Sequence, residues 1–548
     1  MNYKVFIAIL LVGLLCVPAA QALVPGYDDI MAPKKAKGRE PLLISYNDKL
    51  YAFFQVRTDL KDVNGTMYGR RGDIYMNVFN GTNWSGPKCL TPGSKDEGGH
   101  ANHQPKATEF KGKLYLTFES IDPTMKDDDA KSDYDIMMRV FDGTTWTPAL
   151  DQPAQVVSER NDPAHNDTEC RTVVFRDRLF LVWSQQPSDE TYNTTSGAFR
   201  RIVYRSFDGT AWSDVGVAAQ DNSSIFGGSE LAVYKDQLYV AYMSNSSEQR
   251  DMDIFVSRFD GSSWAPPVKA NPTVAGSTAM RQNMNPRVAV HADKLYCTWQ
   301  SADPIGKDGT DYDIMLGSFD GTSWSMAEEV NRHNDRGNDI TPDVKTHEGK
   351  LYVTWTSNDT GINDGGEDFD IMLRCYDGKN WSGIEQVSPY GDNGTIGGDH
   401  NVGDDNTPFL GSWAHKLYCI WITYEQVMTG HSGGNPSVIV RMVRDYDTDG
   451  DGYMDTVDAF PKDPLEWKDT DRDGVGDNSD PRPNDVTIWL KSQLPKTEQT
   501  TFPWPLVIIA ILLIGAVAIV AASMGGRRAG KRADDKKKAD KPKATEEE

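Results

Sequence analysis

The chain has few cysteines for its length. Five remain beyond the N-terminal apolar run that holds Cys16, and they are scattered: Cys89, Cys170, Cys297, Cys375 and Cys419. An odd, scattered set does not make a disulfide framework. Cys297 and Cys419 occupy matching places in a repeated strand, which favours small core positions over a bridge.

Basic residues are also scarce, since 57 Lys and Arg face 80 Asp and Glu and give a formal net charge of −23. This acidity argues against nucleic acid as a partner, because nucleic-acid binding needs a basic footprint. No Gly-x-Ser-x-Gly elbow, His-Glu-x-x-His helix or phosphate-binding loop occurs. The sequence therefore contains no familiar catalytic signature.

Long apolar runs occur only at the two ends. Residues 1–22 have a basic start, an apolar stretch and the small-x-small site Ala20-Gln21-Ala22, which predicts a secretory signal peptide; a retained N-terminal anchor is the alternative. Residues 506–524 carry no charge, and as a helix they would span about 28 Å. With Trp504 before them and Arg527, Arg528, Lys531 and Arg532 after them, they predict one transmembrane helix within 504–524 and a cytoplasmic tail, 525–548.

A strand pattern, Lys-Leu-Tyr-x-x-Trp with variants, recurs seven times and starts at Lys49, Lys113, Arg178, Gln237, Lys294, Lys350 and Lys416. A turn pattern, Phe-Asp-Gly-x-x-Trp, follows six times and ends at Trp84, Trp146, Trp212, Trp264, Trp324 and Trp381. Units of short strands at this period cannot bury their own apolar faces, so they must stack in a ring. The prediction is an all-β fold, a seven-bladed β-propeller of four-stranded blades over residues 23–446.

Eight residues before the strand pattern stands a proline in five repeats: Pro41, Pro105, Pro286, Pro342 and Pro408. Because proline cannot donate to a ladder, we expect it to begin the first strand of each blade. The aromatic residues that close the second strand and the tryptophans after the turns are expected to pack between blades. The seventh repeat lacks its turn, and we expect residues 23–37 to supply its missing outer strand.

Long polar loops fall on one face of such a propeller, and function tends to lie in long loops on a rigid scaffold. We therefore place the binding site there, at the central channel. Its candidate residues are those that break the repeat: His100, His103, Glu169, Arg171, Arg287 and His333. Glu169 and Arg171 are expected to pair with each other, and the histidines can equally be solvated. Asp73, Asp135, Asp253, Asp313 and Asp370 recur before the third strand, which favours a structural role over calcium.

The strongest chemical signal follows the propeller, in two twelve-residue loops at 447–458 and 469–480. Carboxylates stand at positions 1, 3, 5, 9 and 12 with glycine at 6, the spacing by which one loop wraps a hard cation. The expected cofactor is Ca²⁺, with side chains or carbonyls from Asp447, Asp449, Asp451, Tyr453, Asp455, Asp458, Asp469, Asp471, Asp473, Val475, Asp477 and Asp480. A solvated acidic linker is the alternative. Residues 481–503 are read as a linker to the membrane.

Two resemblances add to this. The loops, with Asp458-Ala459-Phe460-Pro461 and Trp467 between them, resemble the thrombospondin type 3 repeats of many archaeal and bacterial surface proteins, which implies a calcium-stiffened stalk. The turns at 206–212 and 318–324 are similar to the Asp-box of sialidase-type propellers, although Asp and Gly are adjacent here. Arg39-Glu40-Pro41 is similar to the Arg-Ile-Pro that opens sialidases. The resemblance to sialidases implies that Arg39, Arg171 and Arg287 form a cluster for the carboxylate of a sugar, with Glu169 as acid/base.

The expected function is a cell-surface, membrane-anchored protein that binds a glycan or an envelope protein through the loop face of its propeller. Ten Asn-x-Ser/Thr sequons, such as Asn64, Asn193 and Asn393, suit an exported glycoprotein. The alternatives are a sialidase-like glycoside hydrolase and a purely structural envelope component.

Overall fold

The computed structural model describes residues 29–30, 37–61, 67–92, 101–121, 134–158, 165–187, 201–219, 225–245, 252–271, 282–302, 311–331, 337–359, 368–388, 404–424, 436–445, 453 and 458–493. Two compact units divide the chain at residue 446. The predicted signal peptide, the predicted span 504–524 and the tail lie outside the described residues. Among the described residues, no helix is long and apolar enough to cross a membrane.

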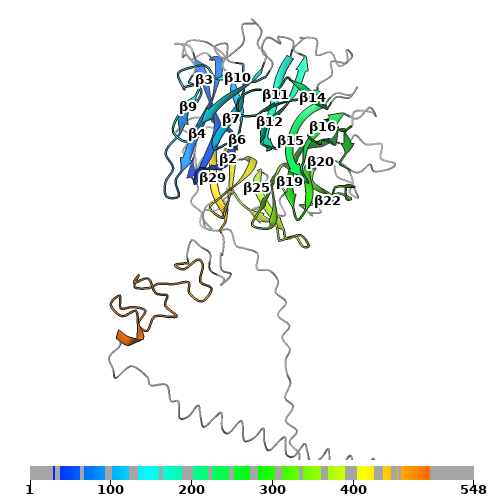
Figure 1. Cartoon of the computed structure of the whole chain (residues 1–548). Helices are drawn as coiled ribbons and strands as arrows, with labels where there is room; N and C mark the ends of the chain where they lie inside the picture. Colours follow the sequence, from blue (N-terminus) through cyan, green and yellow to red (C-terminus); the bar gives the residue numbers. More distant parts are fainter. Residues whose placement is uncertain are drawn as a thin grey trace, which may run out of the picture. The chain divides into compact units, whose positions relative to one another are not determined.

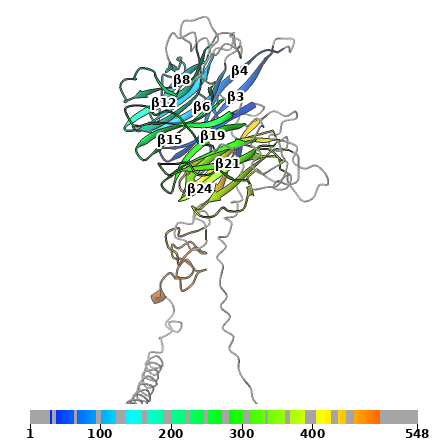
Figure 2. The same cartoon turned by 90° about the vertical axis from the view of Figure 1, so that its right-hand side faces the viewer.

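Seven antiparallel sheets make up the first unit. In six of them the strands follow sequence order from the innermost outward, whereas the outermost strand of the seventh comes from the N-terminal end of the unit. The innermost strands of successive blades contact one another, and the last contacts the first, so the ring is closed (Figures 1 and 2). The prediction of a seven-bladed propeller with four-stranded blades is confirmed.

Blade one consists of β2 (Lys37–Tyr46), β3 (Lys49–Lys61), β4 (Met67–Phe79) and β5 (Lys88–Cys89). Blade two consists of β6 (Asn102–Phe110), β7 (Lys113–Ser120), β8 (Asp135–Phe141), β9 (Trp146–Thr147) and β10 (Gln155–Val156). Blade three consists of β11 (His165–Phe175), β12 (Arg178–Pro187), β13 (Arg201–Phe207) and β14 (Gly216–Ala219). In blade two, β9 and β10 both pair with β8. In blades one and three to six the tryptophan equivalent to Trp146 forms a single bridge to the third strand at the same place.

Blade four consists of β15 (Ile225–Tyr234), β16 (Gln237–Asn245), β17 (Met252–Phe259) and β18 (Val268–Lys269), and blade five of β19 (Asn283–His291), β20 (Lys294–Ser301), β21 (Asp313–Phe319) and β22 (Glu328–Glu329). Blade six consists of β23 (Asp339–His347), β24 (Lys350–Ser357), β25 (Asp370–Tyr376) and β26 (Glu385–Gln386). Blade seven consists of β27 (Asp405–Trp413), β28 (Lys416–Thr423), β29 (Ser437–Arg444) and β1 (Asp29–Ile30).

The ring is closed by the N-terminal segment, as expected. Asp29 and Ile30 of β1 pair antiparallel with Val440 and Ile439 of β29 and form the outer strand of blade seven. A blade built from both ends of the unit holds those ends together, since opening the ring requires breaking that sheet.

The core lies between blades. Trp183, Trp299, Trp355 and Trp421, which close the second strands, are almost fully buried. Each packs in an apolar cluster shared by neighbouring blades. Removing one such side chain would cost about 3–5 kcal/mol, so these aromatic residues are structural, as predicted.

The repeated aspartates before the third strand are structural too. In blade five Asp313 accepts a hydrogen bond from Asn331 Nδ2 at 2.9 Å, and Asn331 Oδ1 accepts the Ile314 N–H. Ser388 with Asp370 and Asn271 with Asp253 repeat the arrangement. Each aspartate thus ties the end of its outer strand to the third strand, which confirms the predicted structural role.

The proline of the first strand does not begin that strand, and this expectation is wrong. Pro41 lies inside β2 and Pro286 inside β19, at breaks in the pairing register. A β-bulge tolerates proline because the extra residues do not pair with the neighbouring strand. The correction matters because these bulges shape the central channel.

Candidate functional site: the axial cavity and the calcium loops

A bulge interrupts the innermost strand of every blade at the same place. In each, the residue just before the proline or its replacement has a positive φ of 50° to 67°: Glu40, Gln104, Glu169, Gly228, Asn285, Thr341 and Thr407. Such backbone costs about 1–3 kcal/mol at a non-glycine residue and persists only where the surroundings fix it. The β-branched Thr341 and Thr407 are the most strained of the set.

Neighbouring blades supply what fixes these bulges. The Gln104 N–H donates to Glu40 Oε2 at 2.5 Å, and the Thr341 N–H donates to Gln300 Oε1 at 2.9 Å. Glu119 accepts the Glu169 N–H, and Glu169 in turn accepts the Gly228 N–H. The side-chain carboxylates of Glu40, Glu119 and Glu169 therefore each accept a backbone N–H of the next blade, and these hydrogen bonds join one blade to the next.

Beside the bulges the channel widens into a cavity of about 530 Å³. The first residues after each bulge form a column with one member per blade, which we call the post-bulge ring: Leu42, Lys106, Arg171, Glu230, Arg287, Asp343 and Phe409. All of them except Asp343 line the cavity, together with Arg39, Glu40 and Asn285. Charged residues occupy blades two to six, and apolar residues occupy blades seven and one.

Ion pairs run along the charged part of this ring. Arg171 Nε lies 3.1 Å from Glu230 Oε2, and Arg287 Nη1 lies 3.5 Å from the same oxygen. Arg287 Nε lies 3.6 Å from Asp343 Oδ1. The carboxylate of Glu230 thus pairs with two guanidinium groups, one from the blade on each side of its own, at the edge of the cavity.

Lys106 is held differently. Its Nζ donates to the Pro105 carbonyl at 3.2 Å, and it faces the cavity beside two arginines. Burial, reinforced by the positive charges of Arg171 and Arg287, lowers the pKa of Lys106 to about 7. Burial raises the pKa of Asp343 to about 6, against the opposing effect of Arg287. The pKa of Glu230 is lowered, because its two arginines outweigh its burial.

The carboxylates of this region are poorly placed for acid/base chemistry. Glu119 is 1% exposed, with Oε2 3.5 Å from His103 Nε2. Burial raises the pKa of Glu119 well above its ordinary value and lowers that of His103. Glu119 is not among the residues that line the cavity, so a ligand bound there does not contact it. Glu230 is paired, and Glu40 and Glu169 accept backbone N–H groups.

The structure brings together part of the predicted site. Arg171 and Arg287 line the cavity, as does Arg39, so the three arginines of the sialidase-type resemblance share one space. The expected pairing of Glu169 with Arg171 is wrong, because Arg171 pairs with Glu230. His103 packs against Tyr134 and Glu119, and His100 and His333 lie outside the described residues. Lys106, Glu230 and Asp343 were not predicted.

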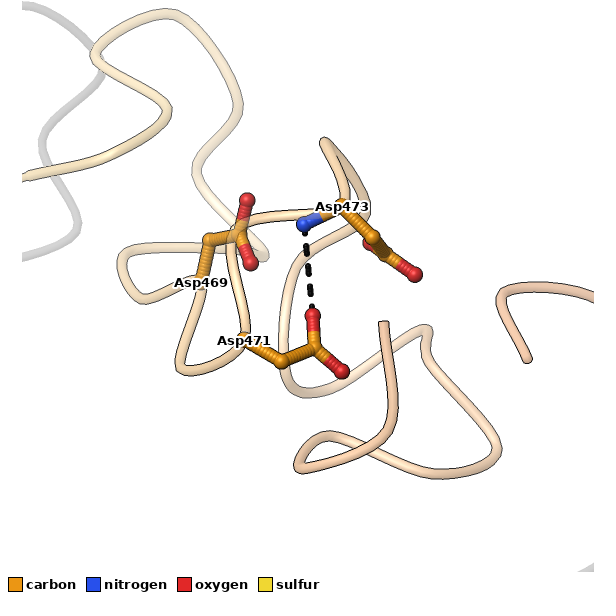
Figure 3. A group of neighbouring side chains, drawn as sticks. All are labelled: Asp469, Asp471 and Asp473. Carbon is orange, nitrogen blue, oxygen red and sulfur yellow. Dashed lines mark hydrogen bonds between the residues drawn. The ribbon is translucent and has the colours of Figure 1, made fainter. Parts of the chain in front are cut away.

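In the second unit the second of the two predicted cation-binding loops, 469–480, is described, and it gathers three predicted ligands. Carboxylate oxygens of Asp469, Asp471 and Asp473 lie within 4.8 Å of one another (Figure 3). One oxygen each of Asp471, Asp473 and Asp480 is buried without a hydrogen-bond partner. Burial and then the charges of Asp473, Asp480 and Asp469 raise the pKa of Asp471. This donor set fits a hard divalent cation.

The other predicted cation ligands differ in their contacts, and some of them lie outside the described residues. Asp477 accepts hydrogen bonds from the N–H and hydroxyl of Thr470, so it braces the loop. Of the first loop only Tyr453 and Asp458 are described. Tyr453 stacks on Trp467 with ring centroids 3.8 Å apart, and Asp458 has one buried oxygen without a partner. Asp447, Asp449, Asp451 and Asp455 lie outside the described residues.

Comparisons with known proteins concern the propeller. No protein-family model and no curated protein matches the sequence. A Trypanosoma rangeli sialidase in complex with the inhibitor DANA is similar over 76% of this chain and 60% of its own length, at 13% identity and a TM-score of 0.39. A Penicillium chrysogenum α-L-arabinanase complexed with arabinobiose is similar over 65% of this chain and 98% of its own, at 12% identity and a TM-score of 0.38.

A thermostable family-43 glycoside hydrolase matches 53% of this chain and 94% of its own length, at 13% identity and a TM-score of 0.31. The chain therefore spans only about 60% of the sialidases that it matches. All three proteins are glycoside hydrolases, and the likeness to them is one of propeller fold.

Proposed function

We propose that this chain is a membrane-anchored cell-surface protein that binds an anionic glycan or protein ligand in the axial cavity of its propeller. The observation that carries the proposal is the post-bulge ring. Arg171 and Arg287 face the cavity beside Lys106, and Glu230 and Asp343 balance part of their charge. Guanidinium groups that are already oriented bind a carboxylate with two parallel hydrogen bonds and little loss of side-chain entropy.

The apolar arc of the ring completes this site. Leu42 and Phe409 line the cavity with Pro41 and Pro408, opposite the charged blades. Ligand sites are typically concave and partly apolar, with a few convergent polar groups. A ligand that carries an acidic group at one end and an apolar face at the other matches both arcs.

The calcium loops are proposed to stiffen the segment that follows the propeller. The support is the set of buried, unpartnered oxygens on Asp471, Asp473 and Asp480. Ca²⁺ supplies the positive charge that offsets their mutual repulsion, and the loop side chains would hold it.

A second candidate, a sialidase-like glycoside hydrolase, is favoured by one observation, the presence of Arg39, Arg171 and Arg287 on a single cavity. Hydrolysis also needs an acid and a second carboxylate or base at the substrate. In the described cavity the accessible carboxylates Glu40 and Glu230 are engaged by a backbone N–H and by two arginines. Binding without turnover is therefore the first proposal.

A glycan array probed with the purified chain tests both. The wild type should retain acidic glycans, and Arg287→Gln should lose them, while Arg374→Gln should not. Arg374 is the matched control because it donates to backbone carbonyls within the blades, away from the cavity. Release of free sugar from the retained glycans would favour the hydrolase, and equal retention by Arg287→Gln would contradict the cavity as the site.

A further inference from the structure

Large apolar side chains lie on the surface of the second unit, near the end of its described part. Val486 is 54% exposed, Trp489 43% and Leu490 54%. They directly precede the 3-10 helix η1 (Lys491–Gln493), the orange ribbon in Figure 1. We call these three residues the apolar turn. Three exposed large apolar side chains within five residues of sequence predict a contact site, because a contiguous exposed apolar patch marks an interaction surface.

The charge of this segment differs from that of the rest of the unit. Residues 486–494 contain one basic residue, Lys491, and no acidic one, whereas residues 458–485 contain nine acidic and four basic residues. Acidic side chains are costly to bring into a bilayer, while tryptophan favours the interface between water and lipid. In the described part of the unit, the apolar turn is thus the segment best suited to a lipid surface.

Chain length places this segment close to the proposed membrane span. Fifteen residues, 491–505, separate Leu490 from the uncharged run that begins at residue 506. Fully extended they reach about 50 Å, and as a flexible chain they average about 20 Å. Such a tether gives a millimolar effective concentration at the bilayer. Even weak insertion would then keep the apolar turn bound.

We propose that the apolar turn docks on the outer leaflet of the membrane, with Trp489 and Leu490 in the headgroup region. The inference rests on the proposed membrane anchor. It assigns this contact to lipid, and a protein cover, either the linker 494–503 or a second copy of the chain, is an alternative outcome of the test. Docking limits the angles through which the calcium unit can swing above the anchor.

Carbene footprinting of the full chain in phosphatidylcholine proteoliposomes tests this. An aryl diazirine dissolved in the bilayer is activated by light, and the labelled residues are read by mass spectrometry. We expect label in residues 506–524 and in the apolar turn, and none on Leu465. Leu465 is the internal control because it is 76% exposed in the same unit and has no proposed lipid contact. A water-soluble diazirine should give the reverse pattern at these two places.

Variants sharpen the result. The double variant Trp489→Ser, Leu490→Ser should lose lipid label at Val486, while Leu465→Ser should leave it unchanged. Label in 506–524 without label in the apolar turn overturns the docking and leaves the anchor intact. Absence of label from both overturns both. Protection of the apolar turn from the soluble reagent without lipid label shows a protein cover, which also overturns the docking.

Discussion

Replacing Glu230 by glutamine separates the structural role of the post-bulge ring from its proposed binding role. Glu230 holds Arg171 at 3.1 Å and Arg287 at 3.5 Å, and its side chain is 23% exposed. A hydrogen bond to a charged group contributes about 1.5–3 kcal/mol. Because Glu230 is partly solvated and its second contact is long, we expect Glu230→Gln to lower the free energy of unfolding by about 2 kcal/mol.

The same change should strengthen ligand binding. A unit charge about 6 Å from a bound anion contributes about 2–3 kcal/mol at an effective dielectric constant of about 20. Water in an open cavity screens part of this, so we expect about a tenfold gain in affinity for an acidic ligand. A variant that loses stability and gains affinity is hard to explain unless Glu230 competes with the ligand for the arginines.

Urea unfolding, followed by tryptophan fluorescence, measures the first effect, and calorimetric titration with the best acidic glycan measures the second. The matched control is Glu348→Gln, because Glu348 pairs with His415 at 2.9 Å on the turn between the first two strands of its blade. That exposed pair should contribute at most about 1 kcal/mol and leave affinity unchanged. Weaker ligand binding by Glu230→Gln would refute the reasoning.

Three further predictions concern protons, calcium and ring closure. Because burial lowers the pKa of Lys106 to about 7, the unfolded chain binds more protons than the folded one between pH 7 and about 10. The free energy of unfolding should therefore gain a rising contribution over that range, which Lys106→Met removes; an unchanged profile in the variant would contradict this. Asp471→Asn should abolish one Ca²⁺ site in calorimetric titrations while Asp463→Asn keeps it, and equal stoichiometry in both would exclude the assigned ligand. Deletion of residues 23–36, which removes β1, should lower the urea midpoint of the propeller, and an unaltered midpoint would show that the ring closes without it.

Much of the fold is predictable because one unit is repeated. The strand pattern at Lys113 and Lys350, with its closing aromatic residues, fixes two strands of each blade, and the turn before each tryptophan fixes the next two. Stacking then follows from the apolar residues on both faces. Ring closure by β1 is also predictable, since the seventh repeat lacks an outer strand and unassigned chain precedes the first.

The pairing within the site is not predictable from alternation. In a regular strand Glu169 and Arg171, two positions apart, would share a face. The bulge places Glu169 in a left-handed conformation, so that Glu169 reaches Gly228 and Arg171 reaches Glu230. A proline pattern alone does not reveal this, because proline suits both the start of a strand and a bulge.

A signal for the missed residues was nonetheless present. Lys106 and Glu230 follow directly on the proline or its replacement, as do Arg171 and Arg287. When the seven repeats are aligned, this column varies from leucine to lysine, glutamate and phenylalanine. In the neighbouring strand, by contrast, the second position of the pattern is always leucine, and the third and sixth positions are always aromatic. Variation between charged and apolar residues at one position of an otherwise regular repeat indicates that this position does not serve the same packing role in every blade.

The most direct test of the central claim is a crystal structure of the chain with the best acidic glycan from the array. The account predicts the ligand in the axial cavity, with its acidic group within hydrogen-bond distance of Arg171 and Arg287 and its apolar face against Leu42 and Phe409. A ligand seated on the outer strands, or at the turns near Asn47 and Glu348, would contradict it.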